Sequence, residues 1–185
     1  MTQNAQTDLA EIKLAILVQQ KGTTTQARSL AQRTSSDHQQ ALTKLRSLAR
    51  TLNVTLPSVP NAQQRSMASA LSAQSGSAFD ISYLKGQVAG HEQSIAQTET
   101  ELSSGSDSQV VAFAKSYLPI AQMHLADAQR DLRQLTGVPS GVNTGSGGLA
   151  ATASGASPVG IGLAGGGAAL ITLAIAVLVR RRRLG

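Results

Sequence analysis

The sequence predicts an all-α protein: an up-down four-helix bundle, then a flexible linker and one C-terminal transmembrane helix. Three observations predict it. Apolar residues recur at spacings of three and four along residues 1–136, without the alternation typical of strands. Small uncharged residues fill 137–158, and an uncharged run at 159–179 ends in four arginines. The predicted domains are therefore the bundle (1–136), the linker (137–158), the membrane span (159–179) and a basic tail (180–185).

The first two predicted helices cover about residues 3–21 and 24–53. Between them, Gly22 ends the first helix, and Thr23 and Thr24 supply a cap for the second. The apolar face of the first helix contains Leu9, Ile12, Ile16 and Leu17. The face of the second helix contains Leu30, Thr34, His38, Ala41, Leu45, Leu48 and Leu52.

Two further long helices follow a loop with two prolines (54–60) and a short helix (61–75). The third long helix, 79–104, has the face Ile81, Leu84, Val88, His91, Ile95, Thr98 and Leu102. A turn at 105–107 leads into the fourth, 107–136, with Asp107 as its N-cap. Its face contains Val110, Phe113, Tyr117, Ala121, His124, Ala128, Asp131 and Leu135. Because proline lacks an N–H, Pro119 predicts a kink or a local break in this helix.

Composition excludes several classes of function. The formal net charge is +6, but Arg180–Arg183 supply four of the 16 basic residues, which leaves 12 basic against 10 acidic residues elsewhere. With two Phe, two Tyr and no basic stripe, nucleic-acid binding is not expected. The absence of Cys excludes disulfides and thiolate ligands. No G-x-S-x-G or H-E-x-x-H motif occurs, so we assign no catalytic residue and favour a non-enzymatic role.

The C-terminal region predicts attachment to the cell envelope. The run at 159–179 is long enough to cross a membrane, and the arginines after it are expected to stay in the cytoplasm, with the bundle outside. The stretch LAATA before it, with this spacer, span and Arg tail, resembles the LAxTG cell-wall sorting signals of Gram-positive surface proteins. Leu149, Ala150 and Thr152 match, and Ala153 departs from the usual Gly. The resemblance implies linkage to the cell wall by a sortase, which would cut after Thr152; a plain membrane anchor is the alternative.

The first predicted helix is short, at roughly 19 residues against about 30 in its neighbour. No signal peptide is visible in MTQNAQTDLAEIKL, although an outward-facing bundle requires export. We therefore expect the true reading frame to begin upstream.

Each of the three histidines lies on the apolar stripe of its own helix and close to that helix's midpoint. At a rise of 1.5 Å per residue, His38, His91 and His124 fall within about 4 Å of one bundle layer. Asp8 and Glu11 of the first helix lie near the same level. Glu11 and the histidines could hold a divalent or iron-type metal ion. Alternatively, the histidines form a structural polar layer with carboxylate partners, for which Asp37, Asp80, Glu92, Glu99 and Asp127 are candidates. No Glu-x-x-His pair occurs, which argues against a carboxylate-bridged di-iron site.

Several motifs together resemble a bacterial family of exported ferritin-like four-helix proteins, known only as a domain of unknown function and often labelled outer-membrane protein. They are LAEI, SDH, LP at 56–57, FDISYLKGQVAGHE, AKSYLPIAQMH and a closing L-x-x-L. The resemblance covers about residues 1–135 and implies a ferritin-like fold. By this resemblance, the family's signature positions in this chain are Glu11, Asp37, His38, Asp80, Tyr83, His91 and His124. It implies no established activity. Two functions stay open: a structural or interaction module exposed outside the membrane, or a metal-binding ferritin-like protein.

Overall fold

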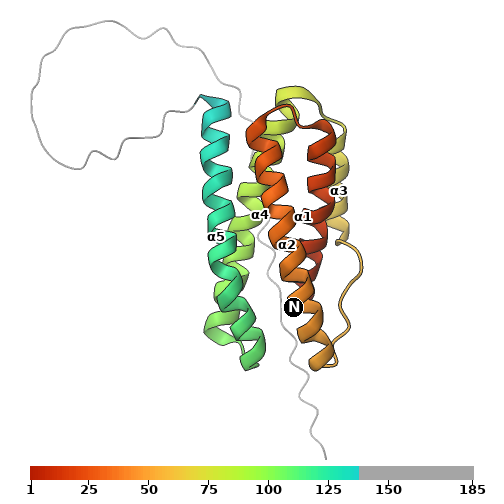
Figure 1. Ribbon diagram of the computed structural model, residues 1–185, viewed down its shortest axis with the longest axis vertical. Helices are drawn as coiled ribbons and strands as arrows, with labels where there is room; N and C mark the ends of the chain where they lie inside the picture. Colours follow the sequence, from red (N-terminus) through yellow and green to blue (C-terminus); the bar gives the residue numbers. More distant parts are fainter. Residues whose placement is uncertain (138–185) are drawn as a thin grey trace, which may run out of the picture. The chain divides into compact units, whose positions relative to one another are not determined.

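The computed structural model describes residues 1–137 and contains five helices in this part of the chain (Figure 1). They are α1 (Thr2–Lys21), α2 (Thr25–Thr51), α3 (Ala62–Ser72), α4 (Gly76–Ser104) and α5 (Ser108–Thr136). The all-α prediction is confirmed for the described residues, and the ends of each predicted helix lie within three residues of the ends of an observed helix. The sorting motif, the membrane span and the Arg tail lie outside the described residues.

The four long helices form two hairpins, α1 with α2 and α4 with α5, which pack together mainly through α2 and α5. Helices α2 and α4 start at the same end of the bundle and run in the same direction (Figure 1). The order is therefore up, down, down, up, whereas strict alternation was expected. The difference arises because residues 52–75 form a connection that runs back along the bundle, with α3 against α1 and α4.

The predicted caps at Thr24 and Asp107 are confirmed. The Thr24 hydroxyl accepts the N–H of Ala27 at 3.3 Å, and Asp107 Oδ1 accepts the N–H groups of Gln109 and Val110. Each cap provides acceptors for N–H groups that lack a partner within the helix. At Pro119 the break does not occur, since α5 continues as one helix from Ser108 to Thr136.

The interior holds apolar clusters towards the two ends of the bundle, with polar residues between them. One cluster includes Val18, Leu30, Phe79 and Leu84, and another includes Leu42 and Leu45 of α2. Residue 38 lies between these clusters along α2, and residue 124 lies between Ala128 of the first cluster and Phe113, which packs against the second, along α5. The bundle thus has a polar layer in its middle.

On α1 and α4, the face that is buried in the structure is rotated about the helix axis from the apolar face that was predicted. On α1, Ile16 is 57% exposed while Asp8 is fully buried. On α4, Tyr83 and Gln87 are buried, whereas Ile81, Val88 and Ile95 are only partly buried. Both shifts have the same cause: polar side chains occupy interior positions, so the apolar residues alone do not mark the centre of the buried face.

Asp80 joins α4 to the turn between α1 and α2. Its carboxylate is fully buried and accepts the N–H groups of Thr23 and Thr24 and the hydroxyl of Thr23, at 2.6–3.1 Å. This contact holds the start of α4 against the start of α2. It therefore fixes the lengthwise register of the helices that carry His91 and His38.

Among residues 1–137, no helix combines the length and the apolar character that crossing a membrane requires. The predicted span at 159–179 is not part of the region to which this finding applies.

Candidate metal centre

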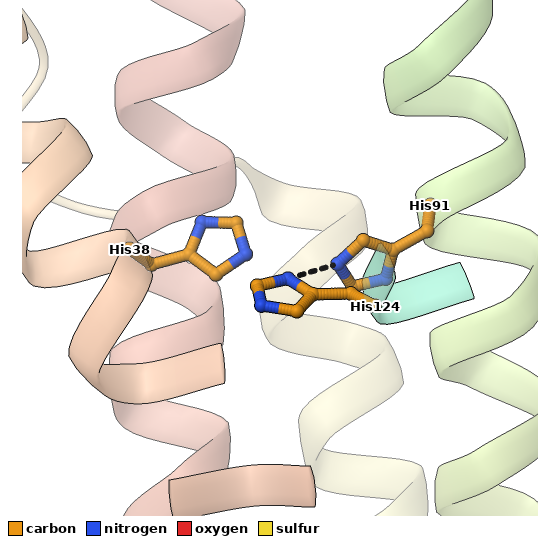
Figure 2. Close-up of side chains that lie close together, drawn as sticks. All are labelled: His38, His91 and His124. Atoms are coloured by element: carbon orange, nitrogen blue, oxygen red, sulfur yellow. Dashed lines mark hydrogen bonds between the residues drawn. The ribbon is translucent and has the colours of Figure 1, made fainter. Parts of the chain in front are cut away.

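Three histidines from three helices meet in the bundle interior (Figure 2). His38 comes from α2, His91 from α4 and His124 from α5. Their exposed fractions are 1%, 2% and 0%, and one ring nitrogen of each lies within 4.8 Å of a nitrogen of the other two. The ring centroids are 5.2–5.9 Å apart. The histidines that helix length and position placed at one level are therefore in mutual contact.

One nitrogen of each ring faces an acceptor outside the cluster. His38 Nδ1 lies 2.8 Å from Asp8 Oδ1, and His91 Nδ1 lies 2.9 Å from the carbonyl oxygen of Gln87. His124 Nε2 lies 2.9 Å from Asp37 Oδ2. When a ring donates its outer N–H to such an acceptor, its other nitrogen carries a lone pair. Carboxylate and carbonyl partners of this kind orient histidines that bind metals through the second nitrogen.

The inner nitrogens do not satisfy one another. His38 Nε2 is buried and has no hydrogen-bond partner among the described residues. His124 Nδ1 lies 3.2 Å from His91 Nε2, the contact drawn as a dashed line in Figure 2. If both rings donate their outer N–H, two lone pairs face each other across this contact.

The contacts around His91 and His124 are one proton short if the carboxyl group of Asp37 is a carboxylate. Three contacts involve the pair His91 and His124: one to Gln87, one to Asp37 and one between the rings. With Asp37 ionised, each contact needs one proton, but two neutral imidazoles carry only two N–H groups. A third proton or a metal ion between the rings would satisfy all three contacts.

Burial sets the charge states of the layer. It lowers the pKa of His38 to about 4, although the carboxylate of Glu11 acts in the opposite direction. It also lowers the pKa of His124 to about 4, against the hydrogen bond to Asp37. Burial raises the pKa of Asp8 to about 8, so near neutral pH this group is mostly a protonated acid that can itself donate to His38 Nδ1. The environment therefore disfavours imidazolium near neutral pH, and neutral imidazole is the form that binds metal ions.

The other signature positions take different places. Glu11 accepts the amide N–H groups of Gln87 at 2.8 and 3.1 Å and bonds to no histidine in the described part. Asp37 lies within hydrogen-bond distance of His124, and Asp80 binds the turn between α1 and α2 at one end of the bundle. The Tyr83 side chain is buried, and burial raises its pKa well above the ordinary value.

Two residues of the layer were not predicted from the sequence: Gln87, and Asp8 as the α1 partner of a histidine. The α1 carboxylates lie three residues apart, so one helical face carries both, and only the packing shows which one reaches His38. Gln87 precedes His91 by four residues, and its backbone oxygen accepts from the His91 ring. That i, i+4 spacing is a local signal for such a contact.

The comparisons with known proteins place the chain in a family. No curated protein and no solved structure matches it significantly. The sequence model of one family, described as a domain of unknown function (DUF4142), matches residues 1–130, which is more than half of the chain and includes all three histidines. The chain therefore belongs to the family of the domain of unknown function DUF4142.

Proposed function

We propose that the bundle binds a divalent transition-metal ion in its interior, with His38, His91 and His124 as ligands. The observation that carries the proposal is the orientation of the imidazoles. Each has its outer nitrogen within hydrogen-bond distance of an oxygen atom, and His38 Nε2 is buried beside the other rings without a partner among the described residues. A buried polar atom without a partner destabilises a fold by about 1–3 kcal/mol. A metal ion would accept this lone pair.

The spacing of the nitrogens suits a small ion after a modest adjustment. Imidazole nitrogens bind zinc at about 2.0–2.1 Å, which places two tetrahedral ligands roughly 3.4 Å apart. The nitrogens of His91 and His124 are already 3.2 Å apart. The three ligand nitrogens all lie within 4.8 Å of one another, so the most distant pair would have to approach by on the order of 1 Å to bind one ion.

The ligand set favours a single ion. Imidazole suits Zn²⁺, Fe²⁺, Cu²⁺ and Ni²⁺, and three ligands leave a coordination position for water or a further group. The bundle has one long crossover connection, as ferritin-like bundles do. We infer a ferritin-like protein with a mononuclear site of iron or zinc type, in place of the carboxylate-bridged pair of ions that Glu-x-x-His motifs hold.

A structural polar layer without metal is the competing interpretation. The hydrogen bonds to Asp8, Gln87 and Asp37 support it. It leaves His38 Nε2 and the contact between His91 and His124 without an explanation. For this reason metal binding is the better account of the layer.

Metal binding can be tested on the full chain in detergent. The protein is stripped with a chelator, exposed separately to Fe²⁺, Mn²⁺, Zn²⁺ and Cu²⁺, and measured by elemental analysis after gel filtration. One bound ion per chain is expected, and binding should be lost in variants with Ala at 38, 91 or 124. A wild type without bound metal, together with variants that lose only stability, would establish the polar layer instead.

We also propose that the bundle is displayed outside the membrane as an anchored module. The support is the uncharged run at 159–179 and the Arg tail after it, which predict the orientation. Linkage to the cell wall through Thr152 rests on the sorting-signal resemblance of Leu149, Ala150 and Thr152. Envelope fractionation of the wild type and Ala153→Gly tests it. If detergent alone releases all of the wild type, sortase processing of this sequence is rejected.

A further inference from the structure

We infer that Asp37 is the access port of the histidine layer: it takes a metal ion from solvent and passes it to His124 and His91. The inference rests on the proposed metal binding and adds a role in the kinetics of loading. It predicts that one carboxylate controls how fast the ion arrives, separately from how tightly it is held.

Within residues 1–137, the histidines of the layer are buried and Asp37 lies at its exposed edge. The side chains of the three histidines are at most 2% exposed, and Asp8, which contacts His38, is fully buried. The side chain of Asp37 is 25% exposed and also lies 2.9 Å from His124 Nε2. Of the side chains hydrogen-bonded to the histidines, it is thus the one in contact with both solvent and the layer.

A small surface hollow lies directly beside this carboxylate. It has a volume of about 30 Å³ and lies between α2 and α5, with a lining that includes Asp37, Gln40, Lys44, Ser116 and Tyr117. Such a volume holds roughly one water molecule or one partly dehydrated ion. The buried ring of Tyr117 forms part of its wall, and that ring is 6.1 Å from the ring of His38. The hollow is therefore separated from the histidines by about one layer of side chains.

The larger hollow between α2 and α5 suits a cation less well. Its volume is about 290 Å³, and both Arg33 and Arg130 line it. Asp127 lies between the two guanidinium groups and is paired with both. None of its lining residues is hydrogen-bonded to a histidine. The arginines already occupy the carboxylates of this hollow, Asp127 and Asp131, and an approaching cation would find no contact that leads to the layer.

Charge at the small hollow should set the loading rate. The carboxylate of Asp37 attracts a cation and can replace part of its water shell with oxygen ligands. The ammonium of Lys44, which lines the same hollow, repels it. Removing either charge should therefore change the association rate, in opposite directions.

The test is stopped-flow loading of Co²⁺ into the metal-free full chain in detergent, followed by the visible absorption of the bound ion. Asp37→Asn keeps an acceptor for His124 but loses the charge, and it should load at least about 10-fold more slowly. Lys44→Gln should load a few-fold faster. Glu99→Gln removes an equal charge from an exposed position on α4 and should stay within about 2-fold of wild type.

The outcomes separate this inference from the proposed function. If Asp37→Asn loads at the wild-type rate and only releases the ion faster, Asp37 is an outer hydrogen-bond acceptor and not the port. If Glu99→Gln slows loading equally, general surface charge is responsible. A wild type that binds no metal ends both proposals. If Asp37→Asn binds no Co²⁺ at equilibrium, Asp37→Glu decides, since it keeps the charge and should load fast; slow loading would overturn the inference.

Discussion

Replacing Asp80 by Ala should loosen the bundle at the end where α1 turns into α2. Its carboxylate accepts three donors, the N–H groups of Thr23 and Thr24 and the hydroxyl of Thr23. A hydrogen bond to a charged group contributes about 1.5–3 kcal/mol. The variant also avoids burying a carboxylate, and water can reach donors that are only partly buried. We therefore expect a net loss of roughly 3–5 kcal/mol in the free energy of unfolding.

This loss converts into a melting-temperature shift that is simple to measure. Unfolding entropy of about 2.1 cal/mol/K per residue gives roughly 0.3 kcal/mol/K for the described part, so the midpoint should fall by about 10–17 °C. Asp80→Asn keeps the size and one oxygen but sets an amide N–H against the donors of the turn. The Asn variant should lose about half as much free energy of unfolding as the Ala variant.

Thermal unfolding followed by far-UV circular dichroism tests both variants. Glu99→Gln is the matched control, because it removes one negative charge from an exposed position on the same helix and should shift the midpoint by less than about 2 °C. A shift below about 3 °C for Asp80→Ala would show that the turn does not depend on this carboxylate and would refute the reasoning.

Three further predictions concern the layer and the glycines. Below pH 6.5 His38 and His124 are protonated in the unfolded chain, whereas in the folded protein they stay neutral down to about pH 4. Acidification therefore lowers the free energy of unfolding. The raised pKa of Asp8 has the opposite effect on stability, because the folded protein takes up that proton at a higher pH than the unfolded chain. Between pH 7 and pH 4 the net loss should be about 2 kcal/mol, and urea titrations of the metal-free protein that show flat or rising stability would contradict it. Asp8→Asn should weaken metal binding about 10–100-fold by calorimetry, and unchanged affinity would remove Asp8 from the site. Gly90→Ala, with open space around its Cβ, should stabilise α4 by about 0.5–1 kcal/mol in thermal unfolding. Gly105→Ala, whose Cβ would lie 2.4 Å from the Glu101 carbonyl oxygen, should destabilise it by about 1–3 kcal/mol, and an equal effect of both would contradict the packing argument.

The helices could be predicted from the sequence because their signals are local. Thr24 and Asp107 cap helices through bonds to residues two or three positions away, and such patterns do not depend on the rest of the fold. The direction of α4 is not a local property. It depends on residues 52–75 running back along the bundle and on Asp80 meeting a turn more than 50 positions earlier. No periodicity in a single helix contains that information.

The candidate site was predictable to the extent that it follows from helix length. The histidines lie near helix midpoints, and this places them at one level whichever way the helices run. The apolar pattern could not predict how far each helix is rotated about its own axis. The choice between Asp8 and Glu11 on α1 depends on that rotation, and so does the burial of Gln87 on α4. Where polar residues fill the interior, apolar periodicity loses its accuracy at the positions that matter for chemistry.

The charges around the layer support the proposal that it binds a cation. The carboxyl groups of Asp8 and Asp37 contact the histidines directly, and that of Glu11 raises the pKa of His38 from a greater distance. A buried carboxylate beside neutral imidazoles is unfavourable unless a positive charge compensates it, and the proton that burial favours on Asp8 does this for Asp8 alone. A proton compensates poorly, because burial also disfavours imidazolium at His38 and His124. A metal ion would supply positive charge, take the place of the missing proton between His91 and His124 and bind His38 Nε2. The proposed ion would therefore satisfy three separate sites of the layer, whereas hydrogen bonding among the described residues leaves at least one of them unsatisfied.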